Sequence, residues 1–124
     1  MQTNIIVRTQ FEGFHKWKEA PFEVKFLRSL HRHIFYIECS IEVYHFDREL
    51  EFFLVKQYID DLIKIELPRR CTAVEEWSCE MYAKFILRQL TEQYGVSRDM
   101  IIRVFEDYEN GAEIIYIKGD IIDD

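Results

Sequence analysis

Residues 31–46 constrain the fold most, because the side chains along this run alternate as they do in a β-strand. A His-x-His pair, His31 and His33, opens the run. Alternate side chains of a strand project from the same face, so the two imidazoles are expected side by side, about 7 Å apart. Two histidines held in this way supply two of the three protein ligands of an open zinc site. His15, at the end of an upstream apolar stretch, is the candidate for the third ligand.

The rest of the chain predicts two helices between two pairs of strands. The expected elements are strands at 4–14 and 31–46, helices at 49–66 and from Trp77 to Gly95, and strands at 100–105 and 112–117. Pro68 is expected to end the first helix, and residues 109–111 to form the turn between the last two strands. This order predicts an α+β fold, a four-stranded antiparallel sheet with both helices on one face. No linker or repeat divides residues 1–124, so a single domain is expected.

Composition excludes several classes of function. The 124 residues carry a net charge of −7, whereas proteins that bind nucleic acid present clustered lysine and arginine. No apolar run approaches the roughly 18 residues of a membrane span, and the first residues do not resemble a signal peptide. Cys39, Cys71 and Cys79 are not spaced as a zinc ribbon and are expected as free thiols. A cytoplasmic protein, with neither nucleic acid nor membrane as partner, is expected.

Five short segments carry a family resemblance. They are Phe11-Glu12-Gly13-Phe14-His15, Leu30-His31-Arg32-His33, Glu51-Phe52-Phe53-Leu54-Val55-Lys56, Ser78-Cys79-Glu80-Met81-Tyr82-Ala83 and Val104-Phe105-Glu106-Asp107. In this order they are similar to the motifs Phe-x-Ala-Ala-His, Leu-His-Gly-His, Asp-Phe-x-x-Leu-Lys, Pro-Thr-x-Glu-Asn-Leu-Ala and Val-x-x-Glu-Thr. These motifs belong to the 6-pyruvoyl-tetrahydropterin synthase and 6-carboxy-tetrahydropterin synthase family. The resemblance extends over nearly the whole chain and implies that family's tunnelling fold.

The resemblance also implies a zinc-dependent enzyme that acts on dihydroneopterin triphosphate or a related pterin. His15, His31 and His33 would hold the zinc ion, which polarises a bound hydroxyl group and lowers its pKa. Glu106 would accept two parallel hydrogen bonds from the amino group and ring N–H of a pterin or a purine. Without the family match, packed or exposed histidines and a solvated acid at a strand end are the alternative.

Two departures from the family pattern leave the catalytic residues unassigned. The synthases carry a cysteine base four residues before the His-x-His pair, and this chain has Leu27 at that position. The synthases also carry an Asp-His pair between the helices, whereas the corresponding residues 65–72 of this chain contain no histidine. Such groups contribute typically about 10² to 10⁴-fold in rate, so the usual reaction is expected to be largely lost unless Glu23, Cys71 or Cys79 replaces them. Two functions stay open: a zinc-dependent lyase or synthase with unusual acid–base groups, and an inactive protein that binds or sequesters a pterin, purine or nucleotide. A purely structural relative with neither metal nor ligand is a third, weaker alternative.

The edges of the predicted sheet indicate self-association. A four-stranded sheet leaves two edge strands whose backbone groups invite pairing. The tunnelling fold closes several subunits into one shared barrel. The resemblance therefore implies a homo-oligomer, a trimer or a hexamer, with sites at the subunit junctions.

Overall fold

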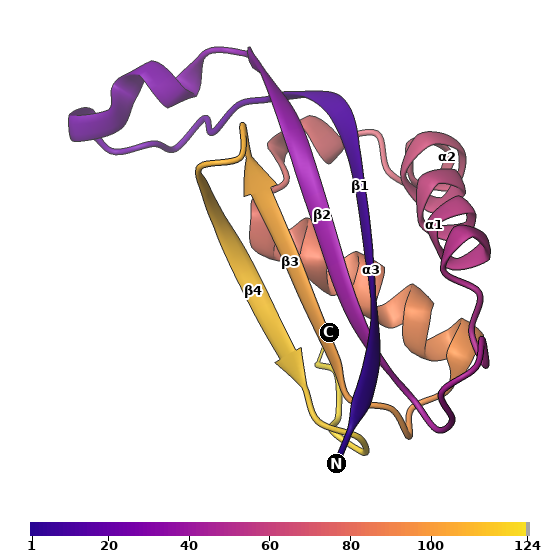
Figure 1. The fold of residues 1–124 in the computed structure, drawn as a ribbon. Helices are drawn as coiled ribbons and strands as arrows, with labels where there is room; N and C mark the ends of the chain where they lie inside the picture. Colours follow the sequence, from indigo (N-terminus) through magenta and orange to yellow (C-terminus); the bar gives the residue numbers. More distant parts are fainter. Residues whose placement is uncertain (124) are drawn as a thin grey trace.

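One antiparallel sheet, ordered β1-β2-β3-β4, organises the computed structural model, which describes residues 1–123 (Figure 1). Its strands are β1 (Thr3–His15), β2 (His31–Val43), β3 (Met100–Glu106) and β4 (Asn110–Tyr116). The predicted α+β class with a four-stranded antiparallel sheet is confirmed. β1 and β2 pair along their whole length, so that His15 lies opposite His31 at one end of the sheet.

Helical segments follow β2 in the chain and cover one face of the sheet (Figure 1). They are α1 (Phe52–Asp61), the π-helix η2 (Leu62–Glu66), α2 (Leu67–Arg70), the 3₁₀-helix η3 (Val74–Glu76) and α3 (Cys79–Tyr94); a further 3₁₀-helix, η1 (Phe22–Arg28), connects β1 to β2. Figure 1 shows α3 crossing behind the sheet while α1 and α2 run beside β1. None of the helices in residues 1–123 is both long and apolar enough to cross a membrane.

The alternation of β2 decides which side chains enter the core. The face predicted to carry the histidine pair also carries four core side chains that are each no more than 2 % exposed: Phe35, Ile37, Cys39 and Ile41. Burial of one large apolar side chain contributes about 1.5–3 kcal/mol. Because a slip of one residue would turn the whole set toward solvent, the core also fixes the register that brings the histidines together.

The first helix differs from the prediction at both ends. It begins at Phe52 rather than residue 49, because the Glu51 side chain accepts a hydrogen bond from the Phe53 backbone N–H at 2.6 Å and caps the helix there. Helical backbone also continues past Pro68, through η2 and α2, to Arg70. The prediction that Pro68 ends the helix is therefore wrong. This proline lies in the first turn of α2, where its missing N–H is not needed.

The turn between β3 and β4 lies earlier than predicted. It is formed by residues 107–109, and Asp107 and Tyr108 adopt positive φ values of 52° and 60°. Residues Asn110 and Gly111, predicted as part of the turn, begin β4 instead. Gly111 serves close packing, since a Cβ atom there would overlap the Val104 carbonyl oxygen.

Other strand and helix ends follow from local hydrogen bonds. β2 ends at Val43, three residues before the predicted limit, because the Tyr44 N–H bonds the Glu49 side chain at 2.5 Å. α3 begins after Ser78, whose hydroxyl accepts a hydrogen bond from the Met81 N–H at 3.2 Å. α3 ends before Gly95, which has a φ of 100° and stands at the predicted helix terminus.

The opposite face of the sheet has no helix over it within residues 1–123. A ladder of ion pairs crosses all four strands on this face: Arg8–Glu38 (2.9 Å), Glu38–Arg103 (2.6 Å) and Arg103–Glu113 (2.5 Å). Exposed pairs of this kind contribute only about 0.2–1 kcal/mol each. The ladder therefore marks a solvated face, bounded by the edge strands β1 and β4.

Candidate metal centre and adjoining cavity

Three histidine rings gather at the end of the sheet where β1 finishes and β2 begins. The register sets His15 opposite His31 and Gly13 opposite His33, so all three rings project from the face that the helices cover. Their ring centroids lie 5.3 Å apart for His15 and His31, 6.1 Å for His15 and His33, and 4.6 Å for His31 and His33. The structure thus brings together the three residues predicted as metal ligands.

Each ring has one buried nitrogen without a hydrogen-bond partner. These atoms are Nδ1 of His15 and Nε2 of both His31 and His33. The other nitrogens of the His-x-His pair are used: His31 Nδ1 lies 2.7 Å from the Ser29 carbonyl oxygen and His33 Nδ1 lies 2.6 Å from Asp107 Oδ2. An unpartnered buried polar atom costs about 1–3 kcal/mol, and a metal ion would accept all three lone pairs.

The spacing of the rings suits a zinc ion. Three imidazoles bound tetrahedrally through Zn–N bonds of about 2.0–2.1 Å hold their centroids roughly 5 Å apart. The three observed separations, 4.6, 5.3 and 6.1 Å, bracket this spacing. Among residues 1–123, however, no set of three His, Cys, Asp or Glu side chains already forms a metal-binding group. The residues fit the ion by type, burial and ring spacing, and rotations of the rings would complete the site.

The surroundings favour neutral imidazole at His15. Burial lowers the pKa of His15, the nearby Glu106 carboxylate opposes this shift, and His31 and His33 lower the pKa further. A neutral imidazole carries the lone pair that a metal requires. The carboxylate of Asp107, which contacts His33, has a pKa held below its ordinary value by hydrogen bonds from the Ile34 N–H and then from His33.

A cavity of about 530 Å³ adjoins the histidine cluster at His15. The residues that line it are His15, Trp17, Leu27, Glu76, Ser78, Cys79, Glu80, Met81, Glu106, Asn110 and Gly111. Glu106, predicted as a ring-binding residue, thus lies in the same space as one candidate metal ligand. Its Oε2 is 3.5 Å from Nε2 of His33, which leaves the carboxylate close to the metal position but outside hydrogen-bond geometry. The cavity therefore offers a carboxylate close to the bare nitrogen of His33.

Cys79 is the cysteine of this cavity. Burial raises the pKa of its thiol to about 12, and the neighbouring Glu106 carboxylate contributes by its charge and by a hydrogen bond. Cys79 therefore stays protonated at neutral pH, as a donor and not as a base. The other replacements considered from sequence, Glu23 and Cys71, are absent from the cavity lining given above.

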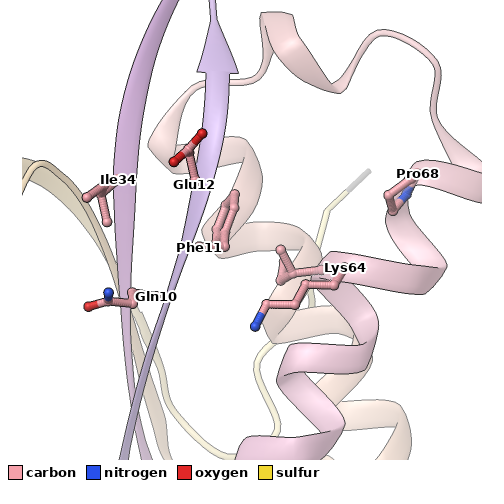
Figure 2. A pocket seen from close by; sticks show the side chains of 7 residues that line it. Gln10, Phe11, Glu12, Ile34, Lys64 and Pro68 are labelled. Atoms are coloured by element: carbon pink, nitrogen blue, oxygen red, sulfur yellow. The ribbon is translucent and has the colours of Figure 1, made fainter.

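A second hollow, of about 560 Å³, lies on the far side of β1 (Figure 2). Figure 2 shows Lys64 reaching from η2 toward β1, whose Gln10 and Glu12 line the opposite wall. It contains none of the histidines and no cluster of titratable groups. This hollow flanks the free edge of β1 and is separate from the candidate metal centre.

The residue that sequence reasoning missed is Asp107. Its carboxylate contacts His33, although 74 positions separate them in the chain. The available signal was an acid directly after Glu106, but the turn was predicted two residues later.

A scan against models of protein families found no match to this chain, and a search of curated proteins found no significant relative.

Proposed function

We propose that this chain is a cytoplasmic, zinc-dependent protein of the 6-pyruvoyl/6-carboxy-tetrahydropterin synthase type, with the tunnelling fold, that acts on a pterin. The observation that carries the proposal is the cluster of three bare, buried histidine nitrogens, in which the His15 ring lines a cavity that also holds Glu106. His15, His31 and His33 would be the zinc ligands. When bound, zinc supplies Lewis acidity and lowers the pKa of a coordinated hydroxyl group.

The cavity supports a flat heterocycle as the ligand. Its volume of about 530 Å³ lies in the range of small-molecule sites, and Trp17 and Met81 provide apolar walls. Glu106 can accept two hydrogen bonds from adjacent N–H groups, which is the pattern along one edge of a pterin. This pairing would fix the orientation of the ring in the cavity.

The charge of the lining favours a related pterin without phosphates over dihydroneopterin triphosphate. Three carboxylates, from Glu76, Glu80 and Glu106, line the cavity, and none of its lining residues is lysine or arginine. A triphosphate would be repelled by these acids unless a second copy of the chain supplied cations. A neutral, hydroxylated side chain meets no such cost.

Proton transfer in this cavity must rely on unusual groups. Leu27 lines the wall and can neither accept nor donate a proton. Cys79 and Glu106 are adjacent, and the thiol is held in its protonated form. We assign Cys79 as a candidate hydrogen-bond donor to the bound substrate, with Glu106 as the group that fixes the ring.

A second candidate function is binding without catalysis. The observation that favours it is Leu27 on the cavity wall, because the family synthases have their cysteine base at this position. A protein with the metal and the Glu106 contact, but without a base, would sequester a pterin, purine or nucleotide and leave it unchanged.

We also propose that copies of this chain associate through the edges of their sheets. β1 and β4 are the free edges of the sheet, and β1 is flanked by the hollow of Figure 2. Pairing of β1 with β4 of another copy would satisfy both edges, and repetition of this contact would close a trimer that could stack into a hexamer. Native mass spectrometry would test this point: a trimer or hexamer is expected, and a monomer at micromolar concentration would contradict it.

The function is tested by incubating zinc-loaded protein with dihydroneopterin and, separately, with dihydroneopterin triphosphate. Products are identified by mass spectrometry, and binding is followed by pterin fluorescence. A changed pterin supports the enzyme, whereas tight binding with no product supports the binding protein. If neither compound binds and purified protein takes up no zinc, both functions are wrong.

A matched pair of variants tests the contact with the ring. Glu106→Ala should weaken pterin binding by about 10- to 100-fold, because hydrogen bonds to a charged group are lost. Zinc content should not change, since Glu106 is not a proposed ligand. Glu109→Ala removes a carboxylate from the adjacent turn and should bind the pterin as wild type does. Equal affinity of all three proteins would contradict the role of Glu106.

A further inference from the structure

Asp107 is held by three hydrogen bonds at the point where β3 ends. Its backbone N–H donates to the Ile34 carbonyl oxygen at 2.7 Å, and its Oδ1 accepts from the Ile34 N–H at 2.9 Å. Its Oδ2 lies 2.6 Å from Nδ1 of His33. Its φ of 52° belongs to the left-handed region, which aspartate and asparagine tolerate better than most residues. The carboxylate is therefore fixed in place against the ring.

This contact decides which nitrogen of His33 carries the proton. An ionised carboxylate can only accept a hydrogen bond, so Nδ1 of His33 must be the donor. In a neutral ring the lone pair then lies on Nε2, which is the buried nitrogen without a partner. His31 has the same arrangement, because its Nδ1 lies 2.7 Å from the Ser29 carbonyl oxygen. Both histidines of the pair thus present Nε2 to the same space.

We propose that Asp107 is a positioning residue of the metal centre, which holds His33 in the tautomer and orientation that ligate zinc through Nε2. This inference rests on the proposed metal site. Carboxylates that accept a hydrogen bond from a ligating histidine fix its ring and raise its basicity. Of the contacts that hold the two rings, this one is made by a side chain, so it can be changed by substitution.

Closing the turn does not require the contact with the ring. The backbone bond to Ile34 and the bond to Oδ1 already tie Asp107 to β2. The second carboxylate oxygen is left for His33. A merely structural role therefore predicts that the contact to His33 can be lost without effect on metal binding, whereas the positioning role predicts weaker binding.

The test uses Asp107→Asn in the full chain. Asparagine tolerates the same backbone conformation, and its amide oxygen can still accept from the Ile34 N–H. Its NH₂ group would then face Nδ1 of His33 and favour the tautomer with the proton on Nε2, which cannot bind a metal through Nε2. Zinc affinity, measured by competition with a chromophoric chelator, should fall by about 10- to 100-fold. Glu109→Gln removes the same charge from the same turn and should bind zinc as wild type does.

Two further readouts separate the outcomes. The visible spectrum of the Co²⁺-substituted protein should change in Asp107→Asn and not in Glu109→Gln. In metal-free wild-type protein, ¹⁵N NMR of the imidazoles should show His33 protonated on Nδ1; protonation on Nε2 would overturn the inference without any variant. Equal zinc affinity of Asp107→Asn and wild type would also overturn it. If wild type itself binds no zinc while the NMR result holds, it is the proposed function that fails.

Discussion

Zinc should stabilise the folded chain by an amount that can be worked out. An ion that binds the folded state alone adds about 2.7 kcal/mol when its free concentration is 100 times its Kd. For 124 residues the entropy of unfolding is roughly 0.26 kcal/mol/K, from about 2.1 cal/mol/K per residue. The expected rise in Tm is therefore about 10 °C.

The assay is thermal unfolding followed by circular dichroism, with chelator and then with zinc. The double variant His31→Ala/His33→Ala should lose both the bound zinc and the shift in Tm. Without metal it should unfold close to wild type, because the lost ring packing is offset by the removal of two unpartnered buried nitrogens. His45→Ala is the matched control, since His45 is exposed beyond the other end of β2 and should leave the shift intact. A shift of equal size in the double variant, or no shift in wild type at saturating zinc, would refute the assignment.

Three further results are expected. Gly111→Ala should lower the free energy of unfolding by about 1–3 kcal/mol, measured by urea denaturation, because the added Cβ atom overlaps the Val104 carbonyl oxygen of β3. An unchanged urea midpoint would contradict this and would show that β3 and β4 move apart to admit the methyl group. At pH 8, iodoacetamide should modify the half-buried Cys71 before Cys79, because the pKa of the Cys79 thiol is raised to about 12. Mass spectrometry of the peptides measures the order of modification, and modification of Cys79 first would contradict the prediction. A hydrogen bond from Lys118 holds the pKa of Glu42 below its ordinary 4.5, so the stability that this contact adds is present above pH 4.5 and is lost as the pH falls below it. The difference in Tm between wild type and Lys118→Met should therefore shrink on acidification, and a constant difference would contradict this.

The strand faces and the histidine cluster could be predicted because both depend on a period of two. Alternation along β2 places His31, His33 and Phe35 on one face, and a core that excludes water holds the register. The candidate ligand from β1 could be named, but only pairing of the strands sets His15 opposite His31. Local pattern was sufficient for this part of the site since each candidate ligand lies near a strand end.

The features that were missed depend on backbone conformations that the pattern does not encode. Asn110-Gly111 is a strong turn signal, yet the turn forms at Asp107 and Tyr108, two non-glycine residues with positive φ. This shift of two residues brings the Asp107 carboxylate to His33. Helical backbone likewise continues past Pro68. The π-helix η2 ends just before α2, so that Pro68 falls in the first turn of α2, where its missing N–H is tolerated.

The proposed zinc centre is tested most directly by a crystal structure of the zinc-loaded protein, with anomalous diffraction data collected on both sides of the zinc absorption edge. One strong anomalous peak is predicted among Nδ1 of His15, Nε2 of His31 and Nε2 of His33, with Asp107 still bound to the outer nitrogen of His33. No peak among these nitrogens, or zinc held elsewhere in the chain, would contradict the metal centre on which the proposed function rests.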